Sequence, residues 1–505
     1  MTTKTTTSAH PGGVGHVRVA VIGTGFAGLA AVDALRKAGI SDFVVLERAH
    51  EVGGTWRDNS YPGISCDVPS HLYSLSFAPN PEWRHSFADG AEIWDYTRRV
   101  ARDLHIDEVT RFGEELLDAT WDNDRQCWRI QTTTLRLTAG AIIDGSGPLS
   151  EPTYPAIEGL DRFAGPIFHS ARWDHDQDLT GLRVAVIGTG ASAIQIVPAI
   201  QPKVDQMTVF QRTPTWVLPR MDRDISDAER RLLRAVPLLQ RAARAGQAIV
   251  RDRGLFQLIH HRRVRRVLEA LGKAYLRRAV KDPALRAKLT PSFELGCKRI
   301  LLSSHWYPAL TQPNVTVQTA PIQQISEHAV ITDDGVKHKV DAIVLATGFH
   351  TSDPPIAERL YGRDGRTLAQ TWAGAPEAFR GVTTANFPNL FRIGSIGTGQ
   401  GHISHILAIE SGVHYAVEAL ATMQSHNLAS VEVTQAAQTT YTSRVNTMLA
   451  DTVWVTGGCT SWYLDASGHV INWPSTARKY RQCTRRFDLE NYAVVNRPQP
   501  SGAAT

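Results

Sequence analysis

The chain has 505 residues, too many for one ordinary domain and suited to two or three, and its hydrophobic content of 42% supports ordinary buried cores. No uninterrupted apolar run approaches the roughly 18 residues that a membrane helix needs, and the polar N-terminal residues lack the apolar core of a signal peptide, so we expect a cytoplasmic protein without stable membrane insertion. The net charge of +5 is unevenly distributed, because residues 221–290 contain 18 Lys and Arg against 7 Asp and Glu, a local charge of +11.

The first chemical signal is a glycine-rich turn that follows the apolar run at residues 17–22. Gly23, Gly25 and Gly28 have the G-x-G-x-x-G spacing of a dinucleotide-binding turn. The first two glycines let the backbone approach a pyrophosphate, and the third permits close packing of helix on strand. Glu47 stands 24 positions after Gly23, where a carboxylate at the end of the second strand hydrogen-bonds a ribose hydroxyl. This part of the chain therefore predicts an FAD site.

Two further segments lie between this turn and a second glycine turn. Gly54, Thr55 and Trp56 follow Glu47 in a loop whose backbone could approach a flavin. Residues 163–174 read F-x-G-x-x-x-H-x-x-x-W-D, with fixed positions at Phe163, Gly165, His169, Trp173 and Asp174. Taken alone, His169 would more often be an ordinary hydrogen-bonded core or hinge histidine.

The second glycine turn follows the apolar run at residues 183–187. Gly188 and Gly190 repeat the first two positions of the motif, and Ala193 stands at the third. Arg212 lies 24 positions after Gly188, where a guanidinium neutralises the 2′-phosphate of NADP and would sit badly beside a free diol. The second turn therefore predicts a site for NADP(H).

The basic stretch at 221–290 has apolar residues at helical spacing, which predicts a helical insertion within the second nucleotide domain. We expect its helices to pack over a cleft with solvated basic faces. Contact with a membrane surface or an anionic partner is the alternative. Nucleic-acid binding is not expected, since the arginines lack interleaved aromatic side chains or a binding motif.

The cysteines exclude one class that also joins FAD to NADPH. Flavoprotein disulfide reductases need two closely spaced thiols at the flavin. The five cysteines here form no such pair, and no Cys/His group has zinc-like spacing, so no metal site is expected. These residues are Cys66, Cys127, Cys297, Cys459 and Cys483.

The pattern at 163–174 resembles the fingerprint of the type I Baeyer–Villiger monooxygenases, the class B flavoproteins that turn ketones into esters or lactones. Related flavin-containing monooxygenases share the front of this motif but usually lack its Trp-Pro/Asp ending. The resemblance extends over nearly the whole chain, through the segments at 61–67, 289–291, 296–299, 341–349 and 458–463. The chain departs from the family pattern at 144–150 and 395–399.

The resemblance implies roles for named residues. Arg299 would stabilise a flavin peroxide and the ketone adduct, because a permanently charged guanidinium does not quench them by proton transfer. Asp67 would hold and partly neutralise Arg299 beside the flavin. Lys298 and Arg212, with Thr213, would bind the 2′-phosphate of NADP.

We therefore predict an α/β protein with two doubly wound dinucleotide-binding domains, for FAD and NADP, and a helical insertion. The FAD domain would comprise 1–150 and 352–505, and the NADP domain would comprise 151–351. The implied activity inserts one oxygen from O2 next to the carbonyl of a small-molecule ketone. Oxidation of nitrogen or sulfur centres is the second hypothesis, and a flavin/NADP redox sensor without turnover is the third. The sequence identifies neither the ketone nor the oligomeric state.

Overall fold

The structure is a computed structural model that describes residues 15–399, 401 and 404–498, so the polar N-terminal residues lie outside the described part. Its first element, β1 (Gly15–Ile22), pairs in parallel with β2 (Phe43–Glu47), and α1 (Phe26–Lys37) connects the two strands. β1 also pairs in parallel with β6 (Arg136–Asp144). Val19, Ala20 and Val21 are fully buried, because β1 has a strand on each edge and helices on its faces.

The first sheet has the order β17-β4-β5-β6-β1-β2-β3, with β18 beside β6. β17 and β18 come from the C-terminal part of the chain, so the chain returns to this sheet after forming the second one. The remaining strands are β3 (Thr110–Phe112), β4 (Leu116–Asp122), β5 (Cys127–Thr132), β17 (Leu360–Tyr361) and β18 (Leu390–Arg392).

The second sheet has the order β12-β9-β8-β16-β7, and all its pairings are parallel. Parallel strands that are covered on both faces usually have continuous apolar sequences. The sequence of β8, RVAVI, fits this pattern after its first residue. Its strands are β7 (Ile167–His169), β8 (Arg183–Ile187), β9 (Gln206–Phe210), β12 (Val315–Gln318) and β16 (Ala342–Leu345). These two sheets and the helices around them confirm the predicted fold class.

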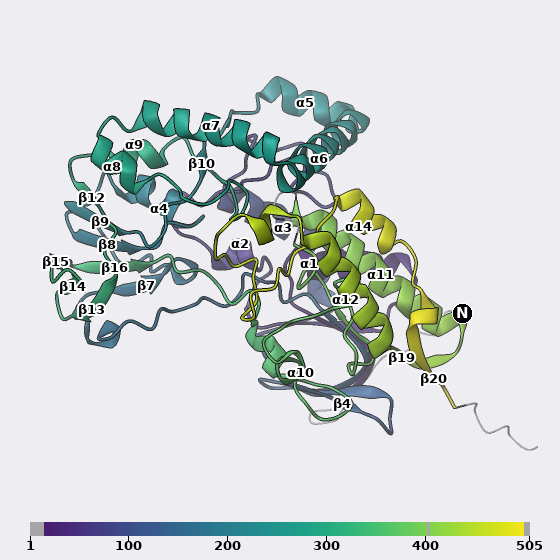
Figure 1. The fold of residues 1–505 in the computed structure, drawn as a ribbon. Helices are drawn as coiled ribbons and strands as arrows, with labels where there is room; N and C mark the ends of the chain where they lie inside the picture. The colour runs from purple at the N-terminus through teal and green to yellow at the C-terminus, as the bar shows by residue number, and fades with distance from the viewer. Residues whose placement is uncertain (1–14, 400, 402–403, 499–505) are drawn as a thin grey trace, which may run out of the picture.

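Four helices fill most of the basic stretch and run along one side of the molecule in Figure 1. α7 contacts α9 (Trp306–Leu310) beside the second sheet, and α6 contacts α13 (Val453–Thr456) from the C-terminal part. The helices are α5 (Asp227–Ala235), α6 (Pro237–His260), α7 (Arg262–Ala279) and α8 (Pro283–Lys288). None of the described helices is long and apolar enough to cross a membrane.

The other elements complete the layers around the two sheets. α1 packs against α11, which is the long helix of the C-terminal part. The helices are α2 (Thr55–Asp58), α3 (Gly90–Asp103), α4 (Ala193–Ile200), α10 (Leu368–Trp372), α11 (His405–Ser425), α12 (Gln435–Leu449) and α14 (Ala477–Cys483). The small strands are β10 (Val217–Leu218), β11 (Leu301–Leu302), β13 (Ile322–Ser326), β14 (Ala329–Thr332), β15 (Lys337–Lys339), β19 (Leu428–Val433) and β20 (Tyr492–Asn496).

Candidate cofactor and reaction site

The first glycine turn lies between β1 and α1, as its spacing predicts. A Cβ atom added to Gly28 would lie 1.9 Å from the Gly23 carbonyl oxygen, so only glycine permits this packing of helix on strand. Gly25 is the N-cap of α1, and no side chain caps this helix or places a carboxylate in its first turn. The first N–H groups of α1 are therefore available to an anion such as a pyrophosphate.

Glu47 ends β2 beside this turn and is 4% exposed. Its carboxylate accepts hydrogen bonds from the Thr24 backbone N–H at 2.8 Å and from the Thr24 hydroxyl at 2.6 Å. It also accepts one from the Ala49 backbone N–H at 2.9 Å, and Arg57 lies 3.2 Å away. These donors fix the carboxylate at the carboxyl end of β2. A ribose hydroxyl would be an additional donor to this preformed acceptor.

The loop of Gly54, Thr55 and Trp56 packs directly on the first glycine turn. A Cβ atom on Gly54 would lie 3.1 Å from the Cα atom of Gly25. Thr55 and Trp56 begin α2, and the Trp56 indole N–H donates to the Tyr73 hydroxyl at 3.0 Å. Tyr73 is a partner that sequence reasoning did not identify.

A buried ion pair stands at the carboxyl ends of two neighbouring strands of the first sheet. Arg392 in β18 donates to Asp144 in β6 at 2.9 Å, and their side chains are 4% and 2% exposed. The Arg392 Nη1 atom and the nearby Ser395 hydroxyl are buried without a hydrogen-bond partner among the described residues. Unpaired buried polar atoms are costly, so this edge fits a polar cofactor that would supply the missing partners. The glycine turn and these atoms together fit FAD.

The two glycines of the second turn, Gly188 and Gly190, differ in the space around them. Gly188 has a φ of +117°, and a Cβ atom there would lie 2.4 Å from the Ala346 carbonyl oxygen. A Cβ atom on Gly190 would meet no atom within 4 Å. Ala193 begins α4, and Ser192 at its N-cap makes no capping side-chain bond. The space above Gly190 thus fits the close approach of a dinucleotide phosphate.

Two cations at the predicted 2′-phosphate position lie near each other. Burial, and then the charge of Arg212, lowers the pKa of Lys298. In the part of the chain that the structure describes, neither side chain forms an ion pair with an acidic group, and the Lys298 Nζ atom lies 5.2 Å from the centroid of the Phe293 ring. Thr213 is tied to the glycine turn, since its carbonyl accepts a hydrogen bond from the Thr189 hydroxyl at 3.1 Å. Two neighbouring cations without a counter-charge fit a phosphate group.

Asp67 and Arg299 form a bidentate ion pair between residues that are 232 positions apart. The Arg299 Nε and Nη2 atoms each donate to one Asp67 carboxylate oxygen at 2.7 Å. Both side chains are a little over one quarter exposed. The Asp67 charge raises the pKa of Arg299 above its usual value. Burial alone would raise the pKa of Asp67, but Arg299 holds it below its ordinary value.

Sequence reasoning missed two neighbours of this ion pair. Arg251, from α6, donates to the Asp67 backbone carbonyl at 3.4 Å. Tyr463 is buried beside Arg299, and burial raises the pKa of its hydroxyl to about 12. Arg251 looked like one of many basic residues of the helical insertion, so no local signal in the sequence singled it out.

A disulfide bond joins Cys297 to Cys459 across 162 residues. It links the segment of Lys298 and Arg299 to the C-terminal segment that carries Tyr463. This pairing was not predicted, because the two cysteines are far apart in the sequence. Cys66 is free and buried, and burial raises the pKa of its thiol to about 12, as expected of a packing residue.

The fingerprint at 163–174 lies on and beside β7, the edge strand of the second sheet. Phe163 is buried, and a Cβ atom on Gly165 would lie 2.2 Å from the Asp341 carbonyl oxygen. His169 is fully buried, and its Nδ1 atom accepts a hydrogen bond from the Ala171 N–H at 3.0 Å. The Trp173 ring meets Phe168 edge to face at 4.8 Å, and Asp174 accepts a hydrogen bond from the Asp176 N–H at 3.0 Å. No described contact joins this segment directly to Asp67 or Arg299.

The fold and the two glycine turns define a class of protein. The sequence model of flavin-binding monooxygenase-like proteins matches residues 16–228 of this chain.

Two curated relatives extend the match over almost the whole chain. One from Streptomyces coelicolor, named "Baeyer-Villiger monooxygenase", is 51% identical over 488 residues, which cover 96% of this chain and 94% of the relative. One of the same name from Pseudomonas aeruginosa is 42% identical over 495 residues, which cover 97% and 94%. The chain therefore belongs to the Baeyer–Villiger monooxygenase family of flavoproteins.

Solved structures agree with this assignment. An oxidized steroid monooxygenase bound to NADP has a TM-score of 0.83 and 29% identity, and the match covers 95% of this chain and 100% of that one. A cyclohexanone monooxygenase from Rhodococcus sp. Phi1 bound to NADP+ has a TM-score of 0.86 and 25% identity, and the match covers 96% and 100%.

Proposed function

We propose that this protein is an NADPH- and FAD-dependent Baeyer–Villiger monooxygenase that converts a ketone into an ester or lactone. In the overall reaction, ketone, O2, NADPH and a proton give ester, NADP+ and water. One oxygen atom enters the bond between the carbonyl carbon and the migrating carbon. The bound flavin supplies the chemistry that passes electrons from NADPH to O2. The observation that carries the proposal is the bidentate Asp67–Arg299 pair, in a chain with two dinucleotide turns.

Arg299 would stabilise the negative charge that develops on oxygen when the ketone carbonyl is attacked. A guanidinium suits this role because its charge is permanent and it does not give up a proton to the developing oxyanion. Asp67 accepts from two of the guanidinium donors, which fixes the plane of the group, and further N–H donors of Arg299 would then be available to a reactant. Tyr463 and Arg251 would help to position this pair.

The remaining site residues would bind the two nucleotides. Glu47 would hold the ribose of FAD, and the uncapped N-terminus of α1 would face its pyrophosphate. Arg212, Thr213 and Lys298 would bind the 2′-phosphate of NADP. These roles support a division into an FAD unit, 1–150 with 352–505, and an NADP unit, 151–351. We also infer a cytoplasmic location, which rests on the sequence alone.

The test is product analysis with purified, FAD-loaded protein. The protein is incubated with NADPH, oxygen-18 gas and a panel of linear, cyclic, aryl and steroidal ketones, and products are analysed by mass spectrometry. We expect at least one ketone to yield an ester or lactone with one labelled oxygen in the ester linkage. An organic sulfide is included in parallel. Sulfoxide formation with no ester from any ketone would instead favour the oxygenation of soft nucleophiles.

A further inference from the structure

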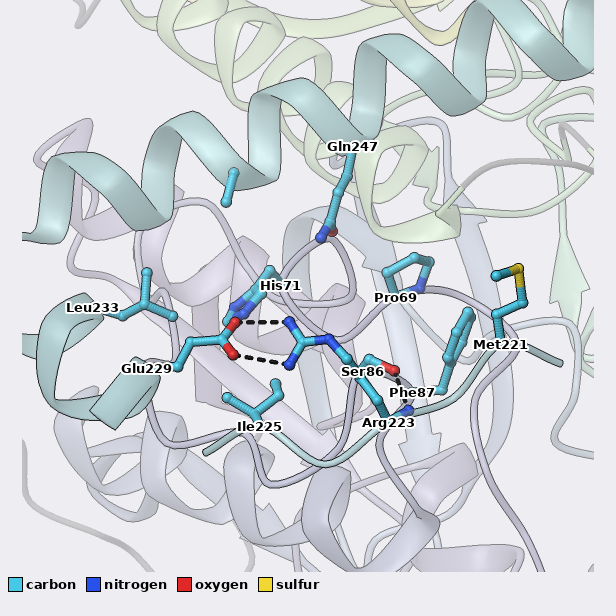
Figure 2. Close-up of a pocket in the computed structure, with 11 residues that line it drawn as sticks. Pro69, His71, Ser86, Phe87, Met221, Arg223, Ile225, Glu229, Leu233 and Gln247 are labelled. Atoms are coloured by element: carbon cyan, nitrogen blue, oxygen red, sulfur yellow. Dashed lines mark hydrogen bonds and ion pairs between the residues drawn. The ribbon is translucent and has the colours of Figure 1, made fainter. Parts of the chain in front are cut away.

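A cavity of about 310 Å³ lies between the loop that follows Asp67 and the helical insertion (Figure 2). Pro69 and Phe87 form its wall on the side of the first sheet, and Ile225, Leu233 and Ala243 form the wall on the side of the insertion. Its volume falls at the lower end of the range for small-molecule sites, which is roughly 300–1,000 Å³. The cavity is therefore large enough for a small organic ligand.

The cavity walls are held together by hydrogen bonds between the two segments that form them. The Ser86 N–H donates to the Arg223 carbonyl at 2.8 Å, and the Ile225 N–H donates to the Arg84 carbonyl at 2.7 Å. The Ser86 hydroxyl also donates to the Asp222 carboxylate at 2.8 Å. This short antiparallel pairing fixes the walls before any ligand arrives, which lowers the entropic cost of binding.

The charges that line the cavity cancel each other. Arg223 donates two hydrogen bonds to the Glu229 carboxylate, at 2.8 and 2.9 Å, and Figure 2 shows this pair among the lining side chains. Neither charge is left free for a ligand of opposite sign. A carboxylate ligand would meet Glu229 without gaining Arg223. The lining therefore offers an ionic ligand no unpaired counter-charge.

Two buried polar atoms in the lining have no hydrogen-bond partner among the described residues. They are the Nδ1 atom of His71 and the Oε1 atom of Gln247, and Figure 2 shows Gln247 pointing from α6 toward the cavity. His71 is 8% exposed, and burial lowers the pKa of its imidazole, which favours the neutral ring. Burying polar atoms without partners is costly, so a ligand that supplies partners gains affinity.

We propose that this cavity binds an uncharged, mainly apolar alcohol of roughly ten non-hydrogen atoms. A hydroxyl group suits both polar atoms, because it can donate to the Gln247 amide oxygen and can donate to or accept from the imidazole nitrogen. The site is separate from the Asp67–Arg299 pair, but α6 and the loop that follows Asp67 contribute residues to both. Arg251, one helical turn beyond Gln247, contacts the Asp67 main chain, and Pro69 follows Asp67 by two residues.

The test measures binding of 1-octanol to the FAD- and NADP-loaded protein by calorimetry. Ala243→Trp places an indole in the cavity, and Ala242→Trp places one on the exposed side of the same helix. We expect wild type and Ala242→Trp to bind equally, and Ala243→Trp to bind at least about tenfold more weakly, as does Gln247→Leu through the lost hydrogen bond. Octanoate should bind much more weakly than 1-octanol. A crystal soaked with 8-bromo-1-octanol should show bromine in the cavity beside the apolar lining of Ile225, Leu233 and Ala243, with the hydroxyl at His71 and Gln247.

Three results would overturn the proposal. They are no measurable binding of 1-octanol to wild type, equal binding by Ala243→Trp and wild type, and bromine located beside Arg299 instead of in the cavity. Retained FAD absorbance and an unchanged melting temperature establish that each variant is folded. If Ala243→Trp fails this check, Gln247→Leu is compared with Gln257→Leu, since Gln257 is an exposed glutamine on the same helix.

Discussion

At the scale of single residues, the proposed 2′-phosphate site is distinguished by two neighbouring cations, Arg212 and Lys298. Some arginines of the proposed FAD unit are paired with an acidic side chain, as Arg57 is with Glu47 and Arg392 with Asp144. Arg212 and Lys298 are instead two neighbouring cations, each without an acidic partner among the described residues, and burial, and then the charge of Arg212, lowers the pKa of Lys298. Such a pair costs free energy unless an anion binds between its members, so it indicates where a phosphate belongs.

Arg212→Ala should change cofactor preference more than activity. In the proposed binding mode, the substitution removes a charged hydrogen-bond donor from the 2′-phosphate of NADPH and removes nothing from NADH. We expect NADPH binding to weaken by about 1.5–3 kcal/mol, with NADH nearly unaffected. Steady-state kcat/KM values for the two cofactors measure this directly. An unchanged ratio between them would show that Arg212 does not read the 2′-phosphate.

His169 should make the folded protein sensitive to acid. Burial, and then the charge of Arg172, lowers the pKa of His169 from 6.5 to about 4, so the folded state resists protonation of this ring. A depressed folded-state pKa contributes stability at neutral pH that is lost as pH falls from about 6.5 to 4, on the order of 3 kcal/mol in total. Between about pH 7 and pH 5, wild type should lose more thermal stability than His169→Asn. Equal losses in the two proteins would contradict this assignment.

At the scale of elements, the two glycines of the second turn serve different needs. Gly188 is required by its own backbone, because its φ is +117° and a side chain would strike the Ala346 carbonyl. Gly190 has room for a side chain in the protein itself. The fold itself does not require glycine at position 190. We infer that glycine is present there because a bound dinucleotide phosphate approaches the backbone closely.

The pair of substitutions Gly188→Ala and Gly190→Ala tests this distinction. Gly188→Ala should lower stability by at least about 1–3 kcal/mol through backbone strain, with a further cost from the clash. Gly190→Ala should melt like wild type but bind NADP+ more weakly, since the methyl group occupies the space left for the phosphates. Melting curves and NADP+ titrations of both variants are the measurements. A destabilised Gly190→Ala protein with normal NADP+ affinity would reverse the two roles.

The Cys297–Cys459 disulfide should stabilise the contact between the Arg299 segment and the C-terminal segment. It closes a loop of 162 residues, and a disulfide of this kind contributes about 2–4 kcal/mol. We expect the double variant Cys297→Ser/Cys459→Ser to melt at a lower temperature than wild type, and a reducing agent to shift wild type in the same direction. The matched control is Cys483→Ser, which removes a free thiol. If the double variant melts like wild type, the bond contributes nothing to stability.

Local patterns in the sequence were enough to predict both glycine turns, the strands around them and the helices of the insertion. These features depend on residues within about 30 positions of each other, such as Gly23 and Glu47. No local pattern indicated the disulfide, the contact of Arg251 with Asp67, or the cavity near His71. Each of these joins residues more than 100 positions apart, and no spacing rule relates them. The Asp67–Arg299 pair is also distant, but it was predicted from the family resemblance.

At the scale of the whole molecule, the reaction site forms where separate parts of the chain meet. Asp67 follows the first β-α-β unit, Arg299 follows the helical insertion, and Tyr463 comes from the C-terminal segment. Neither of the two proposed nucleotide units contains all three of these residues. We infer that the Arg299 charge at this meeting point stabilises the oxyanion that forms during oxygen insertion.

Product analysis of Arg299→Ala, with a ketone that wild type converts, tests this claim most directly. Removing a fixed charge from a developing oxyanion costs on the order of 3–4 kcal/mol. Because FAD is held elsewhere, we expect the variant to stay yellow and to oxidise NADPH with release of hydrogen peroxide. Asp67→Ala should retain more ester formation, since Arg299 is then present but less well oriented. The decisive quantity is ester formed per NADPH consumed, which should fall by at least about a hundredfold in Arg299→Ala. An ester yield close to that of wild type would contradict the assignment of Arg299 to oxygen insertion.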